Sequence, residues 1–144
     1  MSGDRAEVLA RFWAERIPFN ALCRFAVTRW DVDGVCMEVD QRDDLSNGVG
    51  SVHGGVIATL VDTVANAAAI PLDDFAPGSR VATISMTVNY LAPARGHLTA
   101  SAACARRRGS VRSVTVDVRD DTSAVVAHGV VVVKVSAAAT PAPR

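Results

Sequence analysis

The sequence predicts an α+β domain in which an antiparallel sheet packs against one long helix. After a short N-terminal helix, two strand-like segments precede a single long helical stretch, and four further strands follow it with little interruption. Strands grouped before and after one helix, rather than alternating with several helices, are typical of an α+β arrangement. The expected strands cover residues 21–30, 35–39, 80–90, 96–106, 111–119 and 124–135.

The chain is expected to open with a short helix and a hairpin. Apolar residues recur at helical spacing from Arg5 to Ile17, and Pro18 should stop this helix. An Asp-Val-Asp-Gly turn at residues 31–34 joins the first two strands. We therefore expect three parts: an N-terminal helix over residues 1–19, the main domain over residues 20–135, and a disordered Ala/Pro-rich tail over residues 136–144.

The stretch from Asn47 to Pro71 organises the rest of the chain. A glycine-punctuated loop leads into a helix that Ser51 or His53 should cap and that Pro71 should end. One face of this helix is apolar and consists of Ile57, Leu60, Val61, Val64 and Ala68. The opposite face is built of small residues and carries Asp62, the only charge in the helix. A ligand or a second backbone can approach such a face closely, so Asp62 is a candidate functional group.

An ordered set of motifs gives the sequence a specific resemblance. Its members, in chain order, are Asn47, Gly50, His53-Gly54-Gly55, Leu60, Asp62, Thr83, residues 88–94, Gly96, Arg108-Gly109 and a valine-rich last strand. From about residue 20 to residue 135, the chain resembles the hotdog-fold acyl-CoA thioesterases of the PaaI-like group. The resemblance implies that the sheet wraps around the central helix. It also implies that the protein hydrolyses an acyl-CoA to the free acid and CoA.

Thioester hydrolysis needs a carboxylate beside the carbonyl carbon and a hydrogen-bond donor for the developing oxyanion. Asp62 would supply the carboxylate, as base or as nucleophile. The N–H groups of Gly54 and Gly55 at the helix N-terminus would polarise the carbonyl. The resemblance implies that Asn47 places the attacking water or the carbonyl, and that Thr83 supports the carboxylate or the water.

The remaining candidate residues concern the loop and the coenzyme. His53 either hydrogen-bonds the thioester or holds the shape of the loop. The Arg106-Arg107-Arg108 run either binds the phosphates of CoA or forms a solvated turn between two strands. Asn89 lies at a family-like position and is grouped with the substrate-binding residues rather than the catalytic ones. Coenzyme A enters as part of the substrate, and no other cofactor and no metal are expected.

Helical spacing places the two halves of this site too far apart for one chain. Asp62 lies eight residues beyond Gly54, which is about 12 Å along the axis at roughly 1.5 Å per residue. An antiparallel helix from a second subunit would bring Asp62 of one chain beside Asn47 and Gly54 of the other. We therefore expect a homodimer with two shared sites. In line with the family, we expect a homotetramer built as a dimer of dimers.

Composition argues against several other classes of protein. Lys plus Arg and Asp plus Glu number 15 each, so no net charge favours nucleic acid. No apolar run is long enough to span a membrane, and the N-terminus lacks the basic-then-apolar order of a signal peptide. The 3 cysteines have no metal-ligand spacing. We expect a cytoplasmic protein that binds neither nucleic acid nor membrane.

Two other functions stay open on the same fold. A non-catalytic protein that binds or senses acyl-CoA would have no need for a carboxylate on this helix face, so Asp62 favours an enzyme over it. A hotdog hydratase or dehydratase would need a catalytic motif that is not apparent in the sequence. Which acyl group is bound does not follow from the sequence.

Overall fold

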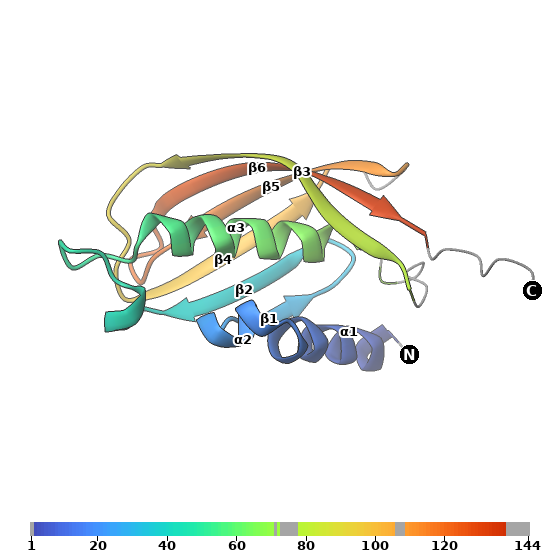
Figure 1. Cartoon of the computed structure of the whole chain (residues 1–144), viewed down its shortest axis with the longest axis horizontal. Helices are drawn as coiled ribbons and strands as arrows, with labels where there is room; N and C mark the ends of the chain where they lie inside the picture. Colours follow the sequence, from blue (N-terminus) through green and yellow to red (C-terminus); the bar gives the residue numbers. More distant parts are fainter. Residues whose placement is uncertain (1, 71, 73–77, 106–108, 138–144) are drawn as a thin grey trace, which may run out of the picture.

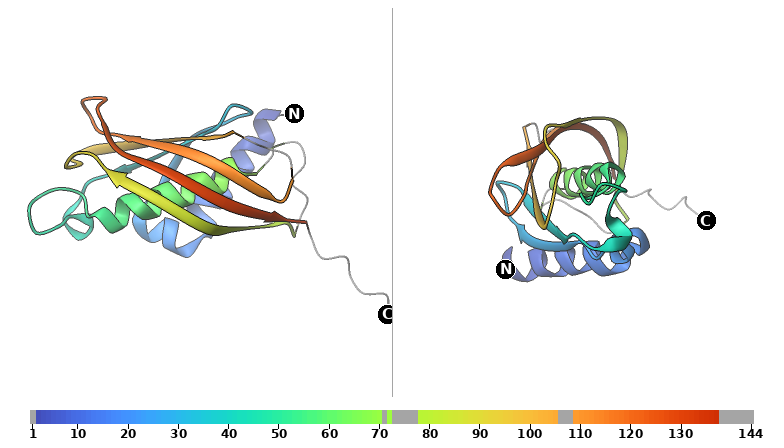
Figure 2. Two further views of the ribbon diagram at one scale, coloured as in Figure 1. Left: turned by 90° about the horizontal axis from the view of Figure 1, so that it is seen from above. Right: turned by 90° about the vertical axis from the view of Figure 1, so that its left-hand side faces the viewer.

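The computed structural model describes residues 2–70, 72, 78–105 and 109–137, and at its centre lies one helix enclosed by a sheet (Figure 1). Within these residues the sheet has six strands, β1 (Ala26–Trp30), β2 (Val35–Asp40), β3 (Arg80–Tyr90), β4 (His97–Cys104), β5 (Val111–Arg119) and β6 (Val125–Ser136). Their order is β1-β2-β4-β5-β6-β3, and every neighbouring pair is antiparallel. The sheet curls around the central helix α3 (Gly54–Ala68), as the end-on view in Figure 2 shows. The predicted α+β hotdog arrangement is confirmed.

Alternation of apolar and polar residues explains why the strands bury one face. Every second residue from Val114 to Val118 is buried in β5, and β4 and β6 show similar alternation. These residues meet the apolar face of α3, where Leu60 and Val64 are fully buried. Gly129 of β6 allows the helix to lie close, since a Cβ at this position would lie 2.5 Å from Val61 Cγ1. The predicted apolar face of the helix is therefore the one that the sheet covers.

The N-terminal end of α3 settles which residue caps the helix, and its C-terminal end lies short of the expected stop at Pro71. Of the two residues considered as the cap, His53 is the one whose side chain accepts a hydrogen bond from the N–H of Gly55, and Ser51 lies in the preceding loop. At its other end the helix stops at Ala68, before Pro71 is reached. Pro71 itself lies outside the described residues.

The N-terminal segment differs from its prediction. It forms α1 (Ser2–Arg11), a π-helical turn η1 (Phe12–Arg16) and a second short helix α2 (Pro18–Cys23). Pro18 does interrupt the first helix, since Ile17 is extended, but it then begins α2 at a position where its missing N–H is not needed. The expected strand start at Ala21 is therefore wrong. Arg24 ends α2 in the left-handed conformation (φ 57°), and β1 begins only at Ala26.

The two edges of the sheet differ in whether another element of the chain packs against them. The edge strand β1 packs against α1, whereas β3 pairs with β6 on one side and with no described strand on the other. Large apolar side chains of β3 are exposed, with Ile84 at 56%, Met86 at 39% and Tyr90 at 53%. Free edges of this kind are usually covered in stable proteins. The β3 edge is thus the surface at which a second chain would be expected.

Candidate active site

Asp62 lies in the middle of α3, and two side chains hold one of its carboxylate oxygens. Thr83 Oγ1, on β3, donates to Asp62 Oδ1 at 2.5 Å, and Asn66 Nδ2, one turn further along α3, donates to the same oxygen at 3.2 Å. Asn66 Nδ2 also donates to Thr83 Oγ1 at 2.8 Å, so the hydroxyl proton of Thr83 is directed toward Asp62. No described residue donates to Oδ2 of Asp62, and this oxygen is available to a substrate.

The helix face that carries Asp62 is only partly open. Ala65 and Ala69, which helical spacing places on this face, are fully buried, and Asn66 is only 8% exposed. The open part lies toward the N-terminus of the helix, at the partly exposed Ala58 and Thr59. The second half of this face packs into the core, so a ligand or a second backbone can approach the small-residue face only along the first half of the helix.

Asp62 borders a cavity of about 390 Å³. Helix α3 contributes one side of it, β3 contributes Met86, and the N-terminal segment contributes the rest. The lining residues are Ile17, Phe19, Asn20, Ala58, Thr59, Asp62, Thr63 and Met86. The volume falls in the range of roughly 300–1,000 Å³ that is usual for small-molecule sites.

The loop before α3 is built around the side chain of Asn47. Its Oδ1 accepts from the N–H groups of Val49 and Ser51, each at 3.0 Å, and its Nδ2 donates to Ser51 Oγ at 2.8 Å. These contacts close the glycine-containing turn and fix the entry of the chain into the helix. One amide hydrogen of Asn47 is left over for a ligand, since Nδ2 carries two.

The two glycines in the first turn of α3 use their N–H groups differently. The N–H of Gly55 donates to His53 Nδ1 at 2.9 Å, so it is engaged, and the neutral imidazole then carries its proton on Nε2. The N–H of Gly54 donates to no described residue, while the Gly54 carbonyl accepts from Tyr90 Oη at 2.9 Å. The free donor lies at the positive end of the helix dipole.

This second group of residues borders a cavity of its own, of about 470 Å³. Asn47, Gly54 and Tyr90 line it, together with Val49, Ser51, Val52, Ile57 and residues 91–94. The two cavities have no lining residue in common. Within one chain the structure thus brings Asp62 and Thr83 together, and Asn47 and Gly54 together, but keeps the two pairs apart.

The other candidate residues lie elsewhere. Val88 packs against the core and Tyr90 reaches Gly54, so Asn89 between them points to the opposite face of β3 and lines neither cavity. The run Arg106-Arg107-Arg108 lies outside the described residues. The nearby Arg112 is 8% exposed and donates to the carbonyl of Ala69 at the C-terminal end of α3, so its guanidinium is committed to the fold.

The sequence predicted no role for two residues near Asp62: Asn66, which contacts the carboxylate, and Phe19, which lines the cavity. Asn66 lies four residues after Asp62, a spacing that places two side chains on one helix face, and it could have been recognised on that ground. Phe19 follows the expected helix stop at Pro18, and nothing in the local sequence indicates that it faces Asp62.

Comparison with known proteins identifies the family. The model of the thioesterase superfamily matches residues 49–127, more than half of the 144-residue chain, and the protein therefore belongs to that superfamily. A Halobacterium salinarum protein named as an esterase is 36% identical over 85 residues, which are 57% of this chain and 56% of that one. Human acyl-coenzyme A thioesterase 13 is 33% identical over 61 residues, 42% of this chain and 41% of that one. The chain thus spans about half the length of the curated relatives that it matches.

Solved structures agree with the fold. A Mycobacterium tuberculosis protein named as an esterase is 25% identical, covers 86% of this chain and 100% of its own, and superposes with a TM-score of 0.78. A Shewanella oneidensis protein described as related to the thioesterase superfamily reaches a TM-score of 0.81 over 94% of this chain and 97% of its own, at 24% identity. The resemblance inferred from the motif between Asn47 and Asp62 is confirmed at the level of the family.

In the ranges that the structure describes, no helix is long and apolar enough to cross a membrane. No group of three or more His, Cys, Asp or Glu side chains in the same ranges could hold a metal ion.

Proposed function

We propose that the protein hydrolyses the thioester of an acyl-CoA, releasing the free acid and CoA. The observation on which this rests is the Asp62 carboxylate, with Oδ1 held by Thr83 and Asn66 and Oδ2 unpaired among the described residues, beside a cavity of about 390 Å³. The cavity belongs to a chain of the thioesterase superfamily. A non-catalytic binder would have no use for this fixed carboxylate with a free oxygen, and the catalytic motif of a hydratase or dehydratase is not apparent in the sequence.

In this reaction Asp62 Oδ2 removes a proton from water as the water oxygen attacks the carbonyl carbon, or it attacks that carbon itself and forms an anhydride. The carbonyl oxygen becomes an oxyanion, for which the free N–H of Gly54 is the candidate donor. The carbon–sulfur bond then breaks, and the thiolate leaves as CoA after taking up the proton that Asp62 removed from water or, on the anhydride route, a proton from solvent. On the anhydride route, water then hydrolyses the anhydride, which releases the free acid and restores the Asp62 carboxylate. His53 holds the shape of the loop through its cap on Gly55, which leaves its Nε2–H without a described acceptor.

We propose that the complete site is shared between two copies of the chain. Within one chain, Asp62 lines one cavity and the Asn47–Gly54 pair lines another, so a single thioester cannot reach both. The unpaired β3 edge, with its exposed Ile84 and Met86, supports association at this surface. An antiparallel partner would place its Asn47 and Gly54 opposite Asp62. Further assembly into a dimer of dimers stays a prediction.

The substitution Asp62→Asn tests the proposed activity. It keeps the size of the side chain and removes its basic and nucleophilic oxygen, so CoA release should fall by about 10²–10⁴-fold, while binding of a non-hydrolysable acyl-CoA thioether should persist. Asp117→Asn is the matched control, because Asp117 pairs with His128 and lies in neither cavity. A loss smaller than tenfold would remove Asp62 from the mechanism.

The same assay separates enzyme from binder. If the wild-type protein binds the thioether but releases no CoA from any acyl-CoA in a panel, the non-catalytic alternative is correct. If CoA is released, a single turnover in ¹⁸O-labelled water distinguishes the two routes, since label recovered in the Asp62 carboxylate indicates the anhydride.

A further inference from the structure

We propose that the N-terminal segment forms the acyl-binding wall of the site, and that Phe19 with its neighbour Ile17 selects uncharged, apolar acyl groups. The inference rests on the proposed thioesterase function and adds the class of acyl group and the residues that select it. It concerns a part of the chain that the family model, which begins at residue 49, does not include.

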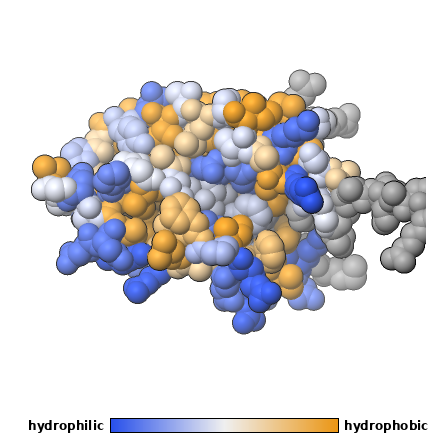
Figure 3. Space-filling model, viewed as in Figure 1, coloured by the Kyte–Doolittle hydropathy of each residue, from blue (hydrophilic) through white to orange (hydrophobic). Residues whose placement is uncertain are grey.

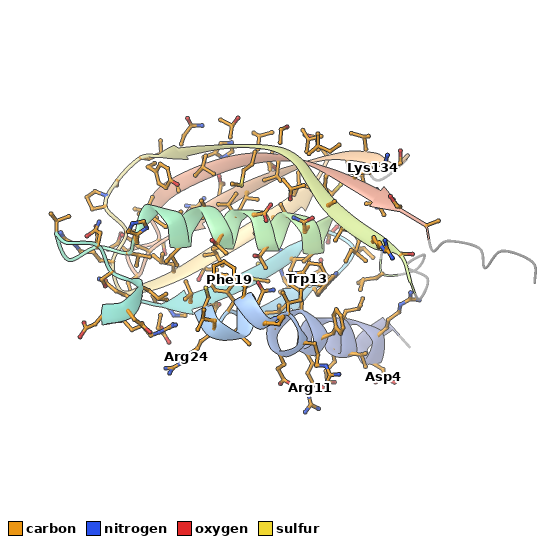
Figure 4. The ribbon with its side chains drawn as sticks, in the orientation of Figure 1. Asp4, Arg11, Trp13, Phe19, Arg24 and Lys134 are labelled. Atoms are coloured by element: carbon orange, nitrogen blue, oxygen red, sulfur yellow. The ribbon has the colours of Figure 1, made fainter. Side chains whose placement is uncertain are left out.

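The wall and the carboxylate border the same cavity. Ile17 and Phe19 line the same cavity as Asp62. Met86, which belongs to strand β3, also lines it. Phe19 and Trp13 both project from the N-terminal segment toward α3 (Figure 4). On the surface, apolar side chains gather beside α3 over the N-terminal helices (Figure 3). An acyl group whose carbonyl carbon lies at Asp62 would therefore have its chain against these side chains.

A closed set of hydrogen bonds fastens this wall to the catalytic helix. Trp13 Nε1 donates to the Thr63 carbonyl at 3.1 Å, and Asn20 Nδ2 donates to the Trp13 carbonyl at 2.8 Å. Thr63 Oγ1 donates to Asn20 Oδ1 at 3.4 Å, which completes the circuit. All three residues are less than 9% exposed. Since Thr63 is the neighbour of Asp62 and Asn20 the neighbour of Phe19, the circuit fixes the wall relative to the carboxylate.

The chemistry of the lining indicates which acyl groups fit. Among the described residues that line the cavity, none is Lys, Arg or His, and the one charged group is Asp62 itself. A second carboxylate at the end of an acyl chain would lose water against Ile17 and Phe19 without gaining a cation, which is costly. Met86 has a flexible thioether side chain that adapts to groups of different shape. Alkyl and aryl acyl groups are therefore favoured over ω-carboxyacyl groups.

The test compares Phe19→Ala with Phe12→Ala. Both phenylalanines belong to the N-terminal segment and are similarly exposed, at 55% and 51%, but Phe12 does not line the cavity. For each variant we would measure kcat/KM with acetyl-CoA, hexanoyl-CoA and adipoyl-CoA, and the Kd of a non-hydrolysable hexanoyl-CoA thioether. Hexanoyl and adipoyl groups have the same number of carbons and differ in the terminal carboxylate.

The wild-type protein should prefer hexanoyl-CoA over adipoyl-CoA by at least about tenfold, and Phe19→Ala should lower the hexanoyl-to-acetyl ratio of kcat/KM by about tenfold. The Kd of the thioether should rise by a similar factor, while Phe12→Ala leaves both values unchanged. Equal ratios in wild type and Phe19→Ala would overturn the proposal. So would a Phe19→Ala protein that loses its oligomeric state in sedimentation and loses activity on all three substrates equally, since Phe19 would then be a subunit contact.

Failure of the parent function gives a different result. If the wild-type protein hydrolyses none of the three thioesters, the proposed thioesterase activity is wrong. In that case the Kd of the thioether still tests whether the N-terminal segment binds the acyl group. A higher Kd in Phe19→Ala but not in Phe12→Ala supports this role, and an unchanged Kd refutes it.

Discussion

Replacing Asn66 with alanine should lower kcat without changing KM, because Asn66 orients the catalytic pair rather than the substrate. Its amide donates to Asp62 Oδ1 at 3.2 Å and to Thr83 Oγ1 at 2.8 Å, and the side chain is 8% exposed. A hydrogen bond to a charged group contributes about 1.5–3 kcal/mol. If that contribution is lost in the transition state, kcat falls by roughly tenfold to a hundredfold.

Steady-state CoA release would be measured for Asn66→Ala, for Thr83→Val and for the double variant. The two side chains act on the same oxygen of Asp62, so the double variant should lose less activity than the product of the single losses. Asn66→Asp should be worse than Asn66→Ala, since it cannot donate and adds a negative charge beside Asp62. An Asn66→Ala protein with a native circular dichroism spectrum and kcat within twofold of wild type would refute the positioning role.

Two further predictions concern the fold. The hydrogen bond to Asp40 (2.7 Å), with Glu38 adding to it, raises the pKa of His97 above 6.5. Its stabilising charge is therefore fully present below the unfolded pKa and is lost as the pH rises through the folded pKa. In urea unfolding, the advantage of wild type over His97→Gln should be larger at about pH 5.5 than at about pH 9, and equal advantages would contradict this. Gly129→Ala places a Cβ 2.5 Å from Val61 Cγ1 and should destabilise the protein by about 1–3 kcal/mol in the same measurement. Val61→Ala should relieve part of that loss, and a purely additive double variant would argue against the contact.

Much of the fold was predictable because the strands follow simple alternation. The predicted and observed bounds of β3 and β5 agree, at Arg80–Tyr90 and Val111–Arg119, since each strand lies between clear turn or loop signals. The N-terminal segment was less predictable. Pro18 can end one helix or begin another, and the left-handed Arg24 that ends α2 carries no glycine signal. The local sequence does not decide whether a second helix follows Pro18. The packing of α2 beside Asp62 in the folded protein does.

The candidate site was predictable where its residues are close in sequence. Asn47, His53 and Gly54 fall in one loop and one helix turn, and the structure gives each of them a defined contact or a free donor. The hydrogen bond between Asp62 and Thr83 joins residues that are 21 positions apart in the sequence. Here the family resemblance, rather than the spacing, carried the prediction. The contribution of Phe19 depends on how three short helices pack, which local sequence patterns do not determine.

The central claim is that Asp62 of one chain acts with Asn47 and Gly54 of another, and mixing two inactive variants tests it most directly. Asp62→Ala and Asn47→Ala homodimers should each be nearly inactive. After unfolding and refolding together at equal concentration, about half of the dimers carry one chain of each kind, and each of these has one site with both substitutions and one site with neither. CoA release should return to about a quarter of the wild-type rate. No recovery, with heterodimers shown to be present by native mass spectrometry, would contradict the shared site.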